Sequence, residues 1–145
     1  MYRNILVATD GTELSGKAVG HGIALAKAVG AKVTGVTVTI PFDAYITSEV
    51  AIDIDTPIFE ERTAAMAKSC LDAIAEQAKR EGVQCVTIRA QVDPIYEGII
   101  DTAEKQRCDL IVMASHGRGG FTGLILGSET TKVLTHSKIP VLVVR

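Results

Sequence analysis

Short apolar runs alternate with helix-length segments along the whole chain, and this alternation constrains the fold more than any other feature. The first run, Ile5 to Ala8, is continuous and ends at Asp10, as expected of a strand buried on both faces. From Leu14 the apolar residues recur at helical spacing until Gly30, which is typical of a helix C-cap. Crossovers of this length connect parallel strands with right-handed topology. The pattern predicts an open, doubly wound α/β fold, with a five-stranded parallel sheet in the order 3-2-1-4-5 and helices on both faces.

The predicted elements fill residues 1–145 as one domain. Strands are expected at 5–8, 32–40, 83–92, 110–113 and 139–144, and helices at 14–30, at 57–81, from Asp93-Pro94 onward, and from Gly127 to about Ser137. Asp93 is predicted to cap its helix, with Pro94 at the first helical position. Residues 42–56 have broken apolar spacing and are predicted to form a surface connection.

Composition and charge exclude several classes of function. The chain has 15 basic and 17 acidic residues, a formal charge of −2, and basic residues scattered along its length, so a nucleic-acid partner is not expected. No apolar run approaches the roughly 18 residues of a membrane span, and no secretory signal is recognised at Met1. Cys70, Cys85 and Cys108 have no metal-binding spacing and are expected to be buried small hydrophobes. These features predict a cytoplasmic protein.

The predicted topology places a ligand beyond the carboxyl ends of the strands, where the strand order reverses. The chemically distinctive strand ends are Ala8-Thr9-Asp10, Val38-Thr39 and the segment from Met113 through Ala114 to Gly117. In the order 3-2-1-4-5 the first and fourth strands flank the reversal point. Asp10 and the loop after the fourth strand are therefore expected to face one crevice.

A glycine-rich loop follows the fourth strand and opens a helix at Ser128-Glu129-Thr130. Its glycines are Gly117, Gly119, Gly120, Gly123 and Gly127. Glycine allows close approach of the backbone to an anion, and the free N–H groups of a helix start favour phosphate. The alternative interpretation is a flexible loop with Ser128 as an ordinary N-cap.

Asp10 has two interpretations of similar weight. As a carboxylate at a strand end, it could hydrogen-bond a ribose hydroxyl or help to hold a metal. Alternatively, Asp10-Gly11-Thr12 is a turn whose carboxylate caps the following helix.

Two further patterns are weaker. Gly11 to Lys17 matches the Walker A spacing, but Ala18 replaces the hydroxyl residue that would bind magnesium, so a turn into an ordinary helix is favoured. Ser115 and His116, together with Asp10, suggest a hydrolytic triad, but adjacent side chains are expected to point apart and no nucleophile elbow is present. No catalytic residue is predicted.

Taken together, these residues resemble the universal stress protein family. Nucleotide-binding members carry G-x-x-G, nine residues, then G-[ST], and this chain has Ala114 to Gly117, nine residues, then Gly127-Ser128. The first strand and turn, Ile5 to Gly11, and the last strand, Ile139 to Val144, are also similar to the family, so the match extends from end to end. The departure is Ala114, which stands where the first glycine is expected.

The resemblance implies ATP binding, alone or with magnesium or manganese, in a nucleotide-responsive stress factor. It implies that Asp10 binds ribose and that Ala8, Thr9, Val38 and Met113 border the adenine. The phosphates would be held by Gly117, Arg118, Gly127, Ser128 and Thr130, with Ala114 and Glu129 in the same site. It also implies a homodimer that pairs its last strands through Val141, Leu142 and Val143. The alternatives are a nucleotide-free dimeric interaction protein, motivated by Ala114, and a slow ATPase.

Overall fold

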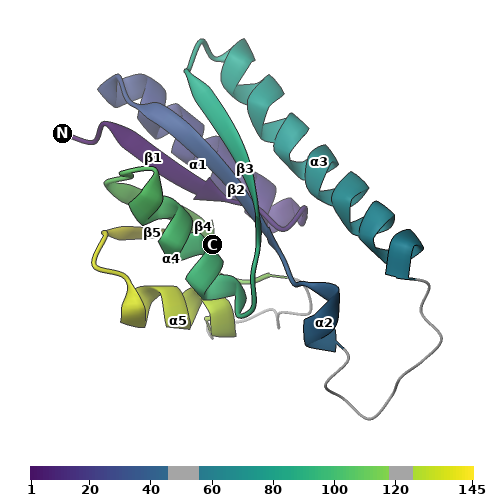
Figure 1. Cartoon of the computed structure of the whole chain (residues 1–145). Coiled ribbons are helices and arrows are strands. Elements are labelled where there is room, and N and C mark those ends of the chain that lie inside the picture. Colours follow the sequence, from purple (N-terminus) through teal and green to yellow (C-terminus); the bar gives the residue numbers. More distant parts are fainter. Residues whose placement is uncertain (46–55, 118–125) are drawn as a thin grey trace.

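The computed structural model of the chain describes residues 1–45, 56–117 and 126–145. Figure 1 shows one twisted sheet with helices on both faces. The strands are β1 (Asn4–Ala8), β2 (Lys32–Thr39), β3 (Cys85–Gln91), β4 (Leu110–Ala114) and β5 (Val141–Val144). The helices are α1 (Glu13–Val29), α2 (Phe42–Tyr45), α3 (Thr56–Arg80), α4 (Ile95–Lys105) and α5 (Ser128–His136). All neighbouring strands are parallel, in the order β3-β2-β1-β4-β5, which confirms the predicted fold and strand order.

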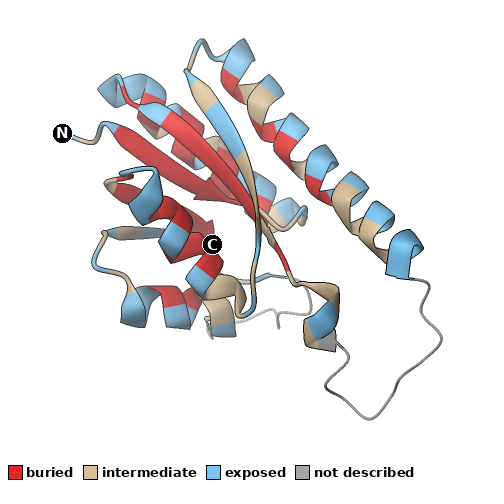
Figure 2. Ribbon diagram, in the orientation of Figure 1, coloured by how far each residue is buried: buried red, intermediate tan, exposed pale blue. Residues whose placement is uncertain are grey.

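The central strands β1 and β4 are buried throughout, as Figure 2 shows. Successive side chains of β1 point to opposite faces of the sheet: Ile5 and Val7 pack with α1 and α3, whereas Leu6 packs with α4 and α5. This double burial is why these strands are continuous apolar runs in the sequence. None of the helices in the described ranges is both long and apolar enough to cross a membrane.

The predicted surface connection over residues 42–56 is wrong at its start, because Phe42–Tyr45 forms the short helix α2. The ring of Phe42 packs against that of Phe59 on α3, with 5.4 Å between the ring centroids. A contact between distant residues stabilises this turn of helix, and local sequence spacing does not reveal such a contact. Residues 46–55 lie outside the described residues.

The predicted cap of α4 is also wrong. Pro94, not Asp93, is the N-cap residue, and it provides no side-chain hydrogen bond. Instead the backbone N–H of Tyr96 donates to Oε2 of Glu129, on α5, at 2.9 Å. A carboxylate from another helix therefore caps α4. The local sequence around Asp93 could not indicate this contact.

The cysteines only partly follow the prediction of burial. Cys108 is buried, but Cys70 and Cys85 are partly exposed, and none of the three forms a disulfide. Cys85 lies on β3, an edge strand of the sheet, so one side of it has no covering strand. Burial raises the pKa of the Cys85 and Cys108 thiols above the ordinary value, so both are poor nucleophiles at neutral pH.

Candidate functional site

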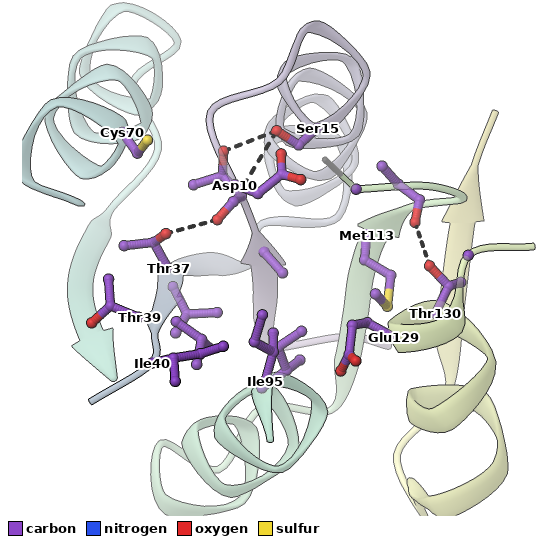
Figure 3. A pocket seen from close by; sticks show the side chains of 18 of the residues that line it. Asp10, Ser15, Thr37, Thr39, Ile40, Cys70, Ile95, Met113, Glu129 and Thr130 are labelled. Carbon is purple, nitrogen blue, oxygen red and sulfur yellow. Dashed lines mark hydrogen bonds between the residues drawn. The ribbon is translucent and has the colours of Figure 1, made fainter. Parts of the chain in front are cut away.

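A cavity of about 650 Å³ opens at the carboxyl ends of β1, β2 and β4 (Figure 3). Its volume is in the range of sites that bind small molecules, about 300–1,000 Å³. The structure brings together the following predicted site residues in its wall: Ala8, Thr9, Asp10, Val38, Met113, Ala114, Gly117, Gly127, Ser128, Glu129 and Thr130. Arg118, Gly119, Gly120 and Gly123 lie outside the described residues.

Part of the cavity wall is formed by helix residues that were not predicted from the sequence. These residues are Phe59, Thr63, Met66, Ala67 and Cys70 on α3, and Ile95 and Ile99 on α4. The α3 residues among them follow helical spacing, which is indistinguishable in sequence from an ordinary buried stripe. Together with Val38 and Met113 they give the cavity an apolar half.

The start of α3 is held over this apolar half by a polar cluster. Nη2 of Arg89, on β3, donates to Oε1 of Glu60 at 2.9 Å, and Nε of Arg89 donates to Oγ1 of Thr39 at 3.0 Å. Nε2 of Gln91 also donates to Glu60, at 3.3 Å. Because Thr39 is itself a lining residue, the cluster fixes the distance between β2 and the α3 wall.

Asp10 forms the turn that leads from β1 into α1. Its Oδ1 accepts hydrogen bonds from the backbone N–H of Thr12 at 3.0 Å and from the Thr12 hydroxyl at 2.6 Å. The predicted turn is therefore present, but Thr12 rather than Asp10 caps the helix, by accepting from the N–H of Ser15. The other carboxylate oxygen, Oδ2, lies toward Gly117, since a Cβ placed on that glycine would be 2.9 Å from it. The carboxylate thus stands between β1 and the loop after β4.

The Walker A-like stretch does not form a phosphate loop. Residues from Glu13 onward are already helical, and Ala18 is fully buried on α1. The hydroxyl of Ser15 donates to the carbonyl of Thr12 at 2.9 Å and lies 3.1 Å from Oγ1 of Thr9. These bonds close the turn as an ordinary helix start, as the sequence favours.

The N-terminus of α5 lines the cavity beside the end of β4. Gly127 is its N-cap residue, without a side-chain cap, so the interpretation of Ser128 as the N-cap is wrong. The N–H of Gly127 donates to the carbonyl of Ser115 at 2.8 Å, which fixes the helix start beside the end of β4. The Thr130 hydroxyl donates to the carbonyl of Ala114 at 2.9 Å, and the residue is 2% exposed. This hydroxyl therefore holds the helix against β4 and is not directed at a ligand. The first backbone N–H groups of α5 have no acceptor within their own helix.

Ser115 and His116 do not point apart, and that prediction is wrong. Oγ of Ser115 lies 2.8 Å from Nδ1 of His116, within hydrogen-bond distance. The chain turns sharply out of β4 at this point, so the alternation of a regular strand no longer applies. Ser115 is nevertheless 2% exposed, which is unsuited to a nucleophile that must reach a substrate.

Comparison with known proteins identifies the family of this chain. A sequence model of the universal stress protein family matches residues 1–145. The chain belongs to the universal stress protein family. This match confirms the resemblance, which was based on the first strand and turn, from Ile5 to Gly11, and on the spacing between Gly117 and Gly127-Ser128.

Relatives in this family are similar over nearly the whole chain. Universal stress protein MJ0531 of Methanocaldococcus jannaschii is 31% identical over 147 residues, covering 100% of this chain and 83% of that protein. The solved structure of hypothetical protein MJ0577 has a TM-score of 0.82 at 28% identity, covering 99% of this chain and 96% of that one. A universal stress protein solved in complex with cAMP has a TM-score of 0.73 at 27% identity, covering 99% and 97% of the two chains.

Proposed function

We propose that this chain binds ATP or a related adenine nucleotide in the cavity and acts in the cytoplasm as a nucleotide-responsive stress factor. The observation that carries the proposal is the meeting of an apolar slot, the Asp10 carboxylate and the α5 N-terminus in one cavity. Three helices that begin beside this cavity differ in their caps: α1 is capped by Thr12 and α4 by Glu129, while α5 has no side-chain cap. Its helix dipole and N–H groups are suited to an anion.

The proposed nucleotide lies with its adenine in the apolar half of the cavity and its phosphates at the start of α5. The adenine lies in the apolar half between Val38 and Met113, and a ribose hydroxyl donates to Asp10. The phosphates then reach Gly127 and Ser128 at the start of α5, where magnesium or manganese accompanies a polyphosphate. The relative that was solved with cAMP supports an adenine nucleotide as the ligand class.

Ala114 does not fill the cavity. The residue is 6% exposed and belongs to the core cluster on the α1 side of the sheet. The neighbouring residue Met113 belongs to the cluster on the opposite face. The methyl group that replaces the family's glycine is therefore accommodated in the core, which favours nucleotide binding over the nucleotide-free alternative.

We expect Asp10→Ala to lower the affinity for ATP at least about tenfold, because it removes a charge-assisted hydrogen bond worth roughly 1.5–3 kcal/mol. Asp101→Ala is the matched control, since it removes the same group from an exposed position on α4 that does not line the cavity. The control should keep its affinity for ATP. Isothermal titration calorimetry measures both affinities. Failure of the wild-type protein to bind any adenine nucleotide at millimolar concentration, with or without magnesium or manganese, would overturn the proposal.

We also propose that two copies pair through β5, the edge strand next to β4. Leu142 is 40% exposed on this strand, and Val141 and Val143 are half-buried. A charged side chain on a pairing edge strand opposes association. Leu142→Lys is therefore expected to give monomers in light scattering, whereas Val86→Lys on the opposite edge strand, β3, should leave the dimer intact. A wild-type protein that is monomeric would contradict this pairing.

A further inference from the structure

The described part of the proposed nucleotide site carries more carboxylates than basic groups. Its lining residues include two carboxylates, Asp10 and Glu129, and one imidazole, that of His116, but no lysine or arginine. Asp10 has a place in the proposed function, because a carboxylate is a good acceptor for a ribose hydroxyl. Glu129 has no corresponding contact with the proposed nucleotide, since a carboxylate repels the phosphates that the α5 N-terminus attracts.

Glu129 is held at this position by the fold. It is the second residue of α5, and its side chain reaches across to the start of α4, where Oε2 accepts from the N–H of Tyr96 at 2.9 Å. Figure 3 shows the carboxylate on the cavity wall between Met113 and Ile95. Lys132 is its nearest described cation, at 3.4 Å from Oε1, but that lysine is 45% exposed and does not line the cavity. The Tyr96 bond prevents the carboxylate from simply turning away into solvent.

A helix N-terminus offers about half a positive charge, whereas the Glu129 carboxylate contributes a full negative one in the first turn. A single phosphate still gains hydrogen bonds from the first N–H groups of α5. Each further phosphate adds negative charge beside Glu129, and the imidazole of His116 is the one basic side chain that the described wall offers to balance it. We propose that Glu129 makes this site selective for a nucleotide with one phosphate, linear or cyclic, and that ATP binds tightly only with a divalent cation. This inference rests on the proposed function and specifies its ligand.

The experiment compares adenosine, AMP, cAMP and ATP by calorimetry on the full chain in buffer with EDTA, and ATP again with magnesium. We expect AMP and cAMP to bind at least about tenfold more tightly than ATP in EDTA, and magnesium to close most of this gap. Glu129→Gln removes the charge and keeps an oxygen that can accept from Tyr96. It should raise the affinity for ATP about fivefold in EDTA while changing that for adenosine very little.

Glu104→Gln, at the far end of α4, removes the same charge from an exposed position and should leave the ATP-to-AMP ratio unchanged. Raising the salt concentration provides a second measurement that needs no variant. Salt screens the charge of Glu129, so the difference between the ATP and AMP affinities of the wild-type protein should become smaller. An ATP affinity in EDTA equal to that for AMP, or a ratio unmoved by Glu129→Gln, overturns the role of Glu129. Those results leave the proposed function intact, whereas an absence of binding to all four compounds overturns both.

Discussion

Replacing Gly22 with alanine is expected to lower the free energy of unfolding by about 2 kcal/mol, which is the usual cost of forcing an extra group into a packed core. Gly22 is buried on α1 where the helix crosses the sheet, and a Cβ at this position would lie 2.3 Å from Cγ1 of Val7. Val7 is fully buried on β1, and its branched side chain has little rotamer freedom. The helix must therefore move away from the sheet.

Gly16→Ala is the matched control on the same helix. A Cβ there has no atom within 4 Å, so only the gain in helix propensity remains. This variant should be more stable by roughly 0.5–1 kcal/mol. Urea unfolding of both variants measures the difference, and equal shifts would show that close packing of α1 on β1 does not require Gly22.

The sheet could be predicted from the sequence because its central strands are buried on both faces. Ile5 to Ala8 on β1 and Leu110 to Met113 on β4 are therefore uninterrupted apolar runs, and their separation by helix-length segments determines parallel pairing. The end of α1 was also predicted correctly, since Gly30 is its C-cap residue and has a φ angle of 73°. What could not be predicted was any feature that depends on a distant side chain. The cap that Glu129 provides for α4 is the clearest case.

The candidate site divides in the same way. Asp10, Met113 and Gly117 could be placed together in advance, because the carboxyl ends of parallel strands meet at one edge of the sheet. The α3 wall was missed because Phe59 and Met66 lie on an apolar stripe that continues the core-facing residues of the same helix. Only the tertiary structure shows that this stripe extends beyond the sheet and covers a cavity.

Replacing Gly127 with alanine is expected to lower the affinity for AMP at least about tenfold, equivalent to roughly 1.4 kcal/mol. A Cβ on Gly127 would lie 3.2 Å from the carbonyl oxygen of Ser115 and 3.3 Å from Cα of His116. Both are backbone atoms, so α5 must move away from the end of β4 and lengthen the 2.8 Å bond between Gly127 N–H and Ser115. The displaced helix start then no longer presents its N–H groups to the phosphate.

Two variants distinguish this mechanism from a general loss of stability. Gly16→Ala, which is remote from these contacts, should bind AMP as the wild-type protein does. Gly117→Ala should also bind weakly, but for another reason, because its Cβ would meet Oδ2 of Asp10 at 2.9 Å and displace that carboxylate. Since adenosine depends on Asp10 but has no phosphate, Gly117→Ala should weaken adenosine binding and Gly127→Ala should not. Calorimetry with both ligands tests this, and equal losses for adenosine in the two variants would show that the glycines do not act at separate parts of the nucleotide.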